Sequence, residues 1–266
     1  MKKVWAFLFY FTYFAAGAAL FPYMALYYQS IGLSGAQMGL LGGLVPLISM
    51  VGAPLWTGMA DATNRPRLIL SVMILAATGA ALSIPTAHGF LPLILAVSAY
   101  ALFSAPIASM GDSITMSSLG EERGMYGRLR LGGTIAWGIM SYIVGRVLDR
   151  NGILWAFWMY GVGMMVNLLV AQGFGSGHVQ KQVSYWSGVG RLLSDRRWGL
   201  FLAIAFLSGA GTATINIYQF VYMADMGASK SLMGLSLTLS TLSELPVLFF
   251  GAWLLKRLGA QGLMLL

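Results

Sequence analysis

Long apolar runs, separated by short polar or glycine-containing stretches, dominate the hydrophobic pattern of this chain. A membrane-crossing helix needs about 20 mainly apolar residues, and at this length the pattern predicts eight helices. They cover Trp5–Tyr28, Met38–Ala60, Leu68–Pro85, Leu91–Ser117, Leu129–Leu148, Ile153–Gly173, Trp198–Val221 and Leu232–Leu255. The first run follows two lysines, but it is longer than the apolar part of a signal peptide and no cleavage site is evident, so it is read as the first transmembrane helix. The pattern predicts an all-α integral membrane protein.

Composition agrees with that prediction and limits the chemistry. Hydrophobic residues make up 58% of the 266 residues and charged residues 9%, against about 25% charged in soluble domains. There is no cysteine, and His88 and His178 stand alone in connecting segments, so we expect no disulfide, no metal site and no cofactor. Without a phosphate-binding glycine loop or a nucleophile–base pair, we expect that the protein is not an enzyme.

The positive charges are unevenly distributed, which predicts an orientation. If the N-terminus is cytoplasmic, 13 of the 16 basic residues fall in cytoplasmic segments, as the positive-inside rule requires. These are Lys2, Lys3, Arg65, Arg67, Arg123, Arg128, Arg130, Lys181, Arg191, Arg196, Arg197, Lys256 and Arg257. Only Arg146, Arg150 and Lys230 fall outside. The net charge of +8 is therefore explained by membrane topology, and no nucleic-acid partner is expected.

A long connection divides the chain into two parts. Residues 174–197 are rich in Gly and Ser and then basic, and they carry an apolar spacing typical of an amphipathic helix on the inner leaflet, at Val183, Trp186, Val189 and Leu193. An ordinary basic loop is the alternative. We predict a six-helix bundle at 1–173, a cytoplasmic linker at 174–197, and the first part of a second bundle at 198–266.

An internal repeat supports this division. The stretch from Gly58 to Arg67 ends the second helix, and a similar stretch from Gly251 to Gly259 ends the second helix after the linker, 193 residues later. Parallel six-helix repeats are one plan of membrane transporters. On that plan eight of about twelve helices are present here, and residues 258–266 begin a ninth.

Three charged residues fall within predicted helices: Asp112, Arg130 and Glu244. Asp112 and Arg130 lie 18 residues apart on either side of a short polar turn, so two antiparallel helices would let them pair. The alternative for Arg130 is a side chain that reaches the membrane interface. Glu244 lies 12 residues into its helix, about 18 Å along it, and so near the bilayer midplane. We expect it to face a cavity, with a structural carboxylate as the alternative.

Uncharged polar residues in the helices form a weaker set of candidates. Asn216 and Gln219 lie three residues apart and so on one helical face, as do Tyr10 and Tyr13 in the first helix. We take Asn216, Gln219 and Tyr13 as substrate-binding candidates. The alternative is that they hold helices together through hydrogen bonds.

The loop after the second helix carries the spacing Gly58-x-x-Asp61-x-x-x-Arg65-x-Arg67. It resembles the signature loop of the major facilitator superfamily, although that family has a glycine where Pro66 stands here. The resemblance implies that this loop latches one conformation of a transporter. Gly58 is expected to allow close helix approach, and Asp61 to accept hydrogen bonds from a neighbouring helix or an arginine. Plain topogenic arginines beside a solvated aspartate are the alternative.

Further motifs resemble the superfamily branch of proton symporters that contains the lactose, nucleoside and phenylpropionate permeases. These are Phe11-Thr-Tyr-Phe14, Gly111-Asp112, Tyr126-Gly-Arg-Leu-Arg130-Leu-Gly-Gly133 and Ser243-Glu244-Leu-Pro246. The resemblance implies that Asp112, Arg130 and Glu244 lie in the central substrate region, with Glu244 and Asp112 coupling the transport to protons.

The resulting hypothesis is a monomeric symporter of a small organic solute and protons in a bacterial inner membrane. The solute would be an aromatic acid, a nucleoside or a sugar. A proton-coupled exporter and a non-transporting sensor or scaffold on the same fold are the alternatives, and solute flux and its direction separate the three.

Overall fold

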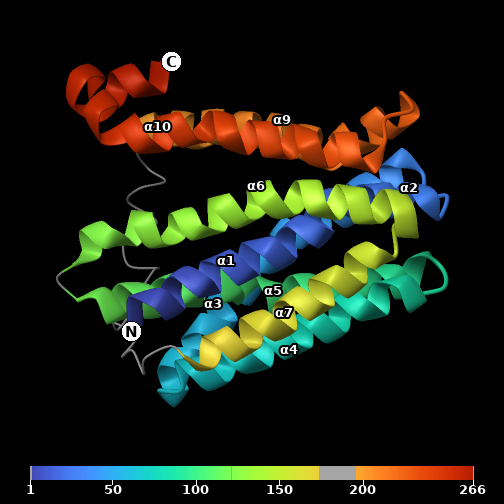
Figure 1. Ribbon diagram of the computed structural model, residues 1–266, viewed down its shortest axis with the longest axis horizontal. Coiled ribbons are helices and arrows are strands. Elements are labelled where there is room, and N and C mark those ends of the chain that lie inside the picture. The colour runs from blue at the N-terminus through green and yellow to red at the C-terminus, as the bar shows by residue number, and fades with distance from the viewer. Residues whose placement is uncertain (1, 121, 174–195, 266) are drawn as a thin grey trace.

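The computed structural model describes residues 2–120, 122–173 and 196–265 of the chain, and within them every long element is a helix (Figure 1). The first crossing is continuous through α1 (Lys2–Leu20), a 3-10 turn η1 (Phe21–Tyr23) and α2 (Met24–Ser30). The other helices are α3 (Gly35–Thr63), α4 (Pro66–Ser83), α5 (Phe90–Leu119), α6 (Tyr126–Asn151), α7 (Trp155–Gln172), α9 (Arg196–Asp225) and α10 (Lys230–Leu265), with 3-10 turns η2 (Ile84–Thr86) and η3 (Arg123–Met125).

Each of the eight predicted spans coincides with a helix, so the predicted fold class is confirmed. Among the described residues, six helical stretches are long and apolar enough to cross a membrane: Lys3–Ser30, Gly35–Thr63, Pro66–Thr86, Phe90–Leu119, Tyr126–Asn151 and Trp198–Asp225. α7 and α10 occupy the two remaining predicted spans. The predicted amphipathic helix in the linker lies outside the described residues.

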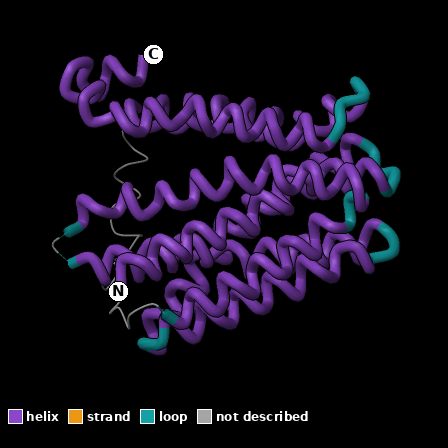
Figure 2. The backbone as a smooth tube through the Cα atoms, in the orientation of Figure 1, coloured by secondary structure: helices purple, strands orange, loops and turns teal. Residues whose placement is uncertain are grey.

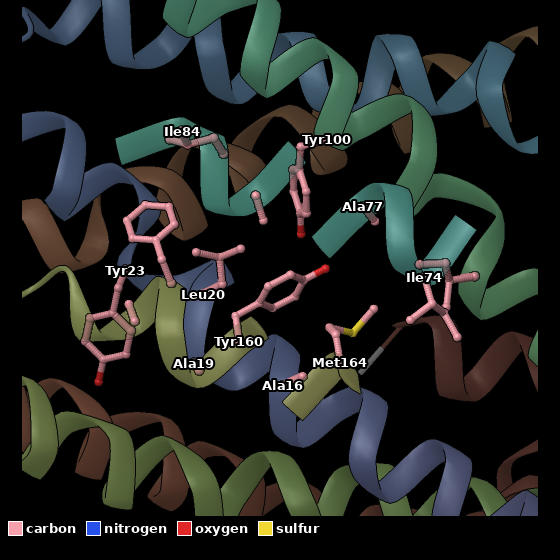
Figure 3. Close-up of a cluster of buried hydrophobic side chains, with 14 of the residues drawn as sticks. Ala16, Ala19, Leu20, Tyr23, Ile74, Ala77, Ile84, Tyr100, Tyr160 and Met164 are labelled. Carbon is pink, nitrogen blue, oxygen red and sulfur yellow. The ribbon is translucent and has the colours of Figure 1, made fainter. Parts of the chain in front are cut away.

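The first six crossings pack into one bundle. α1 packs against α6 and α7, α5 packs against α3 and α4, and α4 also packs against α7. The core between α1, α4, α5 and α7 is apolar and aromatic, with Leu20, Ile74, Met164 and the edge-to-face pair Tyr100 and Tyr160 (Figure 3). Lipid cannot drive this association hydrophobically, so close packing of such side chains must supply it.

α9 and α10 lie along the first bundle, α10 against α6 and α9 against α2 and η1 (Figure 1). Hydrogen bonds join the two parts: Gln29 Nε2 donates to Asp225 Oδ1 (2.7 Å), the Tyr218 hydroxyl to the Gly35 carbonyl (2.8 Å) and the Thr238 hydroxyl to the Gly138 carbonyl (2.7 Å). Asp149 near the end of α6 accepts from the backbone N–H groups of Lys230 (2.7 Å) and Ser231 (2.8 Å), and so caps α10.

Glycines allow α6 and α10 to approach each other closely. A Cβ on Gly145 would lie 2.4 Å from the Lys230 carbonyl oxygen, and one on Gly234 would lie 2.2 Å from that of Ser141. In the described part of the chain nothing lies within 4 Å of a Cβ built on Gly58, so the prediction that Gly58 permits close helix approach is wrong for this structure.

The turns gather at two ends of the molecule (Figure 2). The N-terminus, the α3–α4 turn and the α5–α6 connection lie at one end, called here the N-terminal end, and the connections after α2, α4, α6 and α9 lie at the opposite end. Asn64 closes α3 in the left-handed conformation (φ 55°), and Pro66 opens α4 at a position where its missing N–H is not needed. At Gly259 (φ 68°) the backbone leaves the helical conformation and the chain turns back (Figure 1).

We expect Gly145→Ala to loosen the contact between α6 and α10, because the new methyl group meets a backbone carbonyl that cannot move without its helix. Overpacking of this kind costs about 1–3 kcal/mol. The measurement is cross-linking of a Gln29→Cys, Asp225→Cys pair with a short bifunctional maleimide in this cysteine-free chain. This pair lies on α2 and α9, and it therefore reports on the distance between the same two parts of the chain that α6 and α10 join. Its rate should fall severalfold. Gly127→Ala, on the same helix but facing open space, is the control, and equal rates in both variants would contradict the prediction.

Candidate functional site

Asp112 of α5 and Arg130 of α6 lie face to face, as predicted. Arg130 Nη1 is 3.4 Å from Asp112 Oδ2, and the pair is partly open, with 49% of the arginine side chain and 31% of the aspartate side chain exposed. A lone charge inside a membrane is costly. Here each charge has a partner, and both side chains remain partly exposed.

Two tyrosines complete the cluster, and neither was among the predicted binding residues. The Tyr10 hydroxyl of α1 donates to Asp112 Oδ1 at 2.8 Å, and Arg130 Nη1 donates to the Tyr126 hydroxyl oxygen at 2.6 Å. The guanidinium also lies 5.9 Å from the Tyr126 ring centre, and the Tyr10 and Tyr126 rings meet edge to face at 6.4 Å. Three helices therefore supply one hydrogen-bonded cluster: Tyr10, Asp112, Tyr126 and Arg130.

Aromatic side chains of α1 pack directly against glycines of α5 and α6. This packing holds α1 where Tyr10 reaches Asp112. A Cβ on Gly111, next to Asp112, would lie 2.2 Å from the Phe9 ring. On α6, Cβ atoms on Gly132 and Gly133 would lie 2.6 and 2.4 Å from the rings of Phe7 and Phe14. These contacts need the glycines, because any larger residue would displace a packed ring.

A buried amide adds a polar contact between α7 and α1. Asn167 is fully buried and its Nδ2 donates to the Phe9 carbonyl oxygen (2.9 Å) and to the Thr12 hydroxyl (2.8 Å). Sequence reasoning missed this residue. An asparagine inside an otherwise apolar run was the signal available, since polar groups in lipid must find partners.

The remaining predicted binding residues do not join the cluster through any hydrogen bond or ion pair among the described residues. Tyr13 stacks on Phe9, with ring centres 6.1 Å apart. Asn216 lines an apolar cavity of about 330 Å³ between η1, α2, α3, α5 and α9, while Gln219 lies partly buried on α9. Glu244 is exposed on α10, one turn beyond Thr241, which packs on Gly138 of α6.

The predicted latch residues lie together around the α3–α4 turn at the N-terminal end. Asp61 Oδ1 and Arg67 Nε are both buried without a hydrogen-bond partner in the described part of the chain. Asp61 borders a small cavity of about 60 Å³ shared with Ser109 and Ser113 of α5. Arg65 and Gly58 are exposed.

The chemistry of the site is that of polar recognition. Arg130 presents N–H donors in a fixed fork, Asp112 presents acceptors, and both tyrosines offer a hydroxyl beside an aromatic face. Among the described residues no group of three or more His, Cys, Asp or Glu side chains is arranged to hold a metal ion.

Comparison with known proteins gives consistent matches over the whole chain. Residues 4–266 match the MFS_1 like family. The chain is 29% identical over 267 residues to the maltose permease of Geobacillus stearothermophilus, and 24% identical over 268 residues to the probable 3-phenylpropionic acid transporter of Escherichia coli. These alignments cover 97% and 98% of this chain but 66% and 70% of the relatives, so the chain spans about two thirds of their length.

Among solved structures, the nucleoside transporter NupG matches with a TM-score of 0.82 at 14% identity, over 99% of this chain and 70% of that one. At this identity the match concerns the fold alone.

We expect Arg130→Gln to lower the yield of correctly folded protein more than the double variant Asp112→Asn, Arg130→Gln does. The single change strands one charge, whereas the double change strands none. Because the pair is partly exposed, the cost should be below the roughly 3–5 kcal/mol of a fully buried pair. Size-exclusion chromatography of fluorescent fusions gives the yields.

Arg128→Gln on the same helix, where no ion pair is formed within the described chain, is the control for loss of positive charge. If the double variant folds no better than Arg130→Gln, the pair does not act as a mutually neutralising unit.

Proposed function

Because the chain belongs to the MFS_1 like family, we propose that it is part of a secondary active transporter that moves a small organic solute together with protons. The observation that carries this proposal is the Asp112–Arg130 pair, joined by Tyr10 and Tyr126 and left partly open inside a bundle of apolar helices. The partial exposure of the pair leaves donors and acceptors that a solute can reach.

Contacts between the two parts of the chain support an alternating-access mechanism. Hydrogen bonds from Gln29 to Asp225 and from α10 to Asp149 lie toward the end opposite the N-terminus. Such a closed end fits one state of a transporter whose halves rock about a central site. In this proposal the solute reaches the cluster from the N-terminal end.

The donors and acceptors of the cluster suit a solute with hydroxyl or carboxylate groups and one apolar face. A carboxylate would pair with the Arg130 guanidinium, and hydroxyl groups would donate to Asp112. Relatives named for maltose and 3-phenylpropionic acid, and a fold match named for nucleosides, span this same range. We therefore propose a sugar, a nucleoside or an aromatic acid as the solute.

Asn216, which lines the cavity between η1, α2, α3, α5 and α9, is proposed to extend the solute site together with Gln219 and Tyr13. That cavity has a mainly apolar wall that includes Phe21, Tyr28 and Tyr100, with Ser104 and Asn216 as polar groups. Aromatic walls with few polar groups favour a ring-shaped solute.

Glu244 is the proposed proton carrier, with Asp112 as a second coupling residue. Thr241 packs on Gly138 of α6, and Glu244 lies one turn beyond it on α10. α10 runs antiparallel to α6, since Lys230 meets Gly145 and Thr241 meets Gly138. Glu244 therefore lies on the side of Thr241 toward the level of Arg130. A carboxylate that changes protonation there would change the electrostatics of the solute site.

The α3–α4 loop is proposed to latch the other conformation of the transporter, the one that is closed at the N-terminal end. The loop residues are Gly58, Asp61, Arg65 and Arg67. Asp61 Oδ1 and Arg67 Nε have no hydrogen-bond partner among the described residues. This suits groups whose partners form in another state, because a latch acts by favouring one state over the other. We further propose that the N-terminus is cytoplasmic, since 13 of the 16 basic residues then lie inside. We also propose that the protein is a monomer in a bacterial inner membrane.

Uptake into energised membrane vesicles tests the proposal. We expect accumulation of a labelled sugar, nucleoside or aromatic acid that an uncoupler abolishes. Glu244→Gln should lose accumulation but keep solute exchange, because exchange needs binding and rocking without net proton movement. A tenfold loss of accumulation corresponds to about 1.4 kcal/mol of lost coupling.

Ser243→Ala, one residue away on the exposed part of α10, is the matched control and should transport normally. Accumulation by Glu244→Gln against a gradient would assign coupling to another residue, and the absence of uncoupler-sensitive flux for every solute tested would contradict proton-coupled transport itself.

A further inference from the structure

A groove runs between α6 and the start of α10 at the end of the bundle opposite the N-terminus, away from the Asp112–Arg130 cluster. Its volume is about 550 Å³. It is lined by Tyr142, Arg146, Asp149 and Arg150 of α6 and by Ser229, Ser231, Leu232 and Leu235 at and beyond the start of α10. We call it the α6–α10 groove.

Two arginines and one aspartate line this groove and leave it with a net positive charge. Arg146 and Arg150 lie four residues apart, on one face of α6, and both are exposed. Neither forms an ion pair with any residue that the structure describes, and the Arg146 guanidinium lies 5.4 Å from the Tyr142 ring centre. The Asp149 carboxylate between them is already bonded to the Lys230 and Ser231 N–H groups and to the Ser231 hydroxyl.

These charges run against the distribution in the rest of the chain. Arg146, Arg150 and Lys230 are the three basic residues that the proposed topology leaves outside, and the structure brings all three to the junction of α6 and α10. Positive charge at that end opposes the proposed orientation rather than supporting it. A ligand with negative charge explains the cluster where topology does not.

The remaining wall of the groove is apolar. Leu232 is 50% exposed, and Leu235 and Tyr142 are each 37% exposed. Tyr142 lies eight residues before Arg150, about 12 Å deeper along the helix. The groove therefore presents guanidinium groups near the helix ends and apolar side chains toward the membrane interior.

We propose that the α6–α10 groove binds one anionic phospholipid. The lipid phosphate accepts hydrogen bonds from Arg146 and Arg150, with the Ser229 hydroxyl beside it, and one acyl chain lies along Tyr142 and Leu235. Each leaflet of a membrane offers phosphates at the depth of helix ends. A soluble phosphate would use the arginines but leave the apolar wall uncovered. Because the groove is formed by a helix from each part of the chain, the lipid contacts both.

Native mass spectrometry of the purified chain, titrated with phosphatidylglycerol or phosphatidylcholine, tests this site. We expect one tightly held phosphatidylglycerol and weaker phosphatidylcholine binding. Each basic residue near an anionic lipid adds to its affinity, so Arg146→Gln with Arg150→Gln should weaken the phosphatidylglycerol affinity about thirtyfold. Arg150→Gln alone should weaken it by a smaller factor, and Arg128→Gln, at the other end of α6, should leave it unchanged.

Three results would overturn the proposal. The first is equal phosphatidylglycerol affinity in the wild type and the double variant. The second is equal affinity for the two lipids in the wild type. The third is displacement of phosphatidylglycerol by millimolar inorganic phosphate, which would assign the groove to a soluble anion. A charge-keeping control is the double variant Arg146→Lys, Arg150→Lys. Both positions are exposed, and this variant should retain the preference for phosphatidylglycerol.

Discussion

A charged pair inside apolar helices is the constraint on which the arrangement of this bundle depends. Asp112 and Arg130 lie on separate helices joined by a short connection, and their separation of 3.4 Å neutralises two charges that lipid would otherwise penalise. The pair alone leaves one carboxylate oxygen and several guanidinium N–H groups without a hydrogen-bond partner. Tyr10 and Tyr126 meet part of that demand, and so α1 is tied to the same point as α5 and α6.

Close backbone approach makes that arrangement possible. Phe9 fits against Gly111 and Phe14 against Gly133, so the aromatic face of α1 meets helices without side chains at those positions. The same principle operates between α6 and α10, where Gly145 and Gly234 each meet a backbone carbonyl. Within the first bundle these contacts fix the cluster, whereas between the two parts of the chain they close one end. A solute site that is rigid on one side and movable on the other fits the proposed transport mechanism.

The approximate positions of the spans in the described part of the chain, and the Asp112–Arg130 pair, could be predicted from the sequence, because apolar run length and short connections restrict which helices lie antiparallel. The helix limits differ from the predicted ones, by as much as ten residues at the end of α10. The partners from distant helices could not. Periodicity places Tyr10 and Tyr13 on nearly the same face of α1, but only packing decides that Tyr10 meets Asp112 while Tyr13 stacks on Phe9. Asn167 and the open surroundings of Gly58 were missed for the same reason. The roles of Glu244, Asn216 and Gln219 stay predictions.

The most direct test of the central claim, that the Asp112–Arg130 cluster binds solute, is protection of a nearby single cysteine. Met116→Cys lies one turn from Asp112 on the same face of α5, in a chain without other cysteines. Gly124→Cys, at the exposed α5–α6 connection on the same end of the molecule, reports whether the reagent has access. The account predicts that a saturating transported solute slows alkylation of Met116→Cys severalfold and leaves Gly124→Cys unchanged. Unchanged alkylation of Met116→Cys under saturating solute would contradict it.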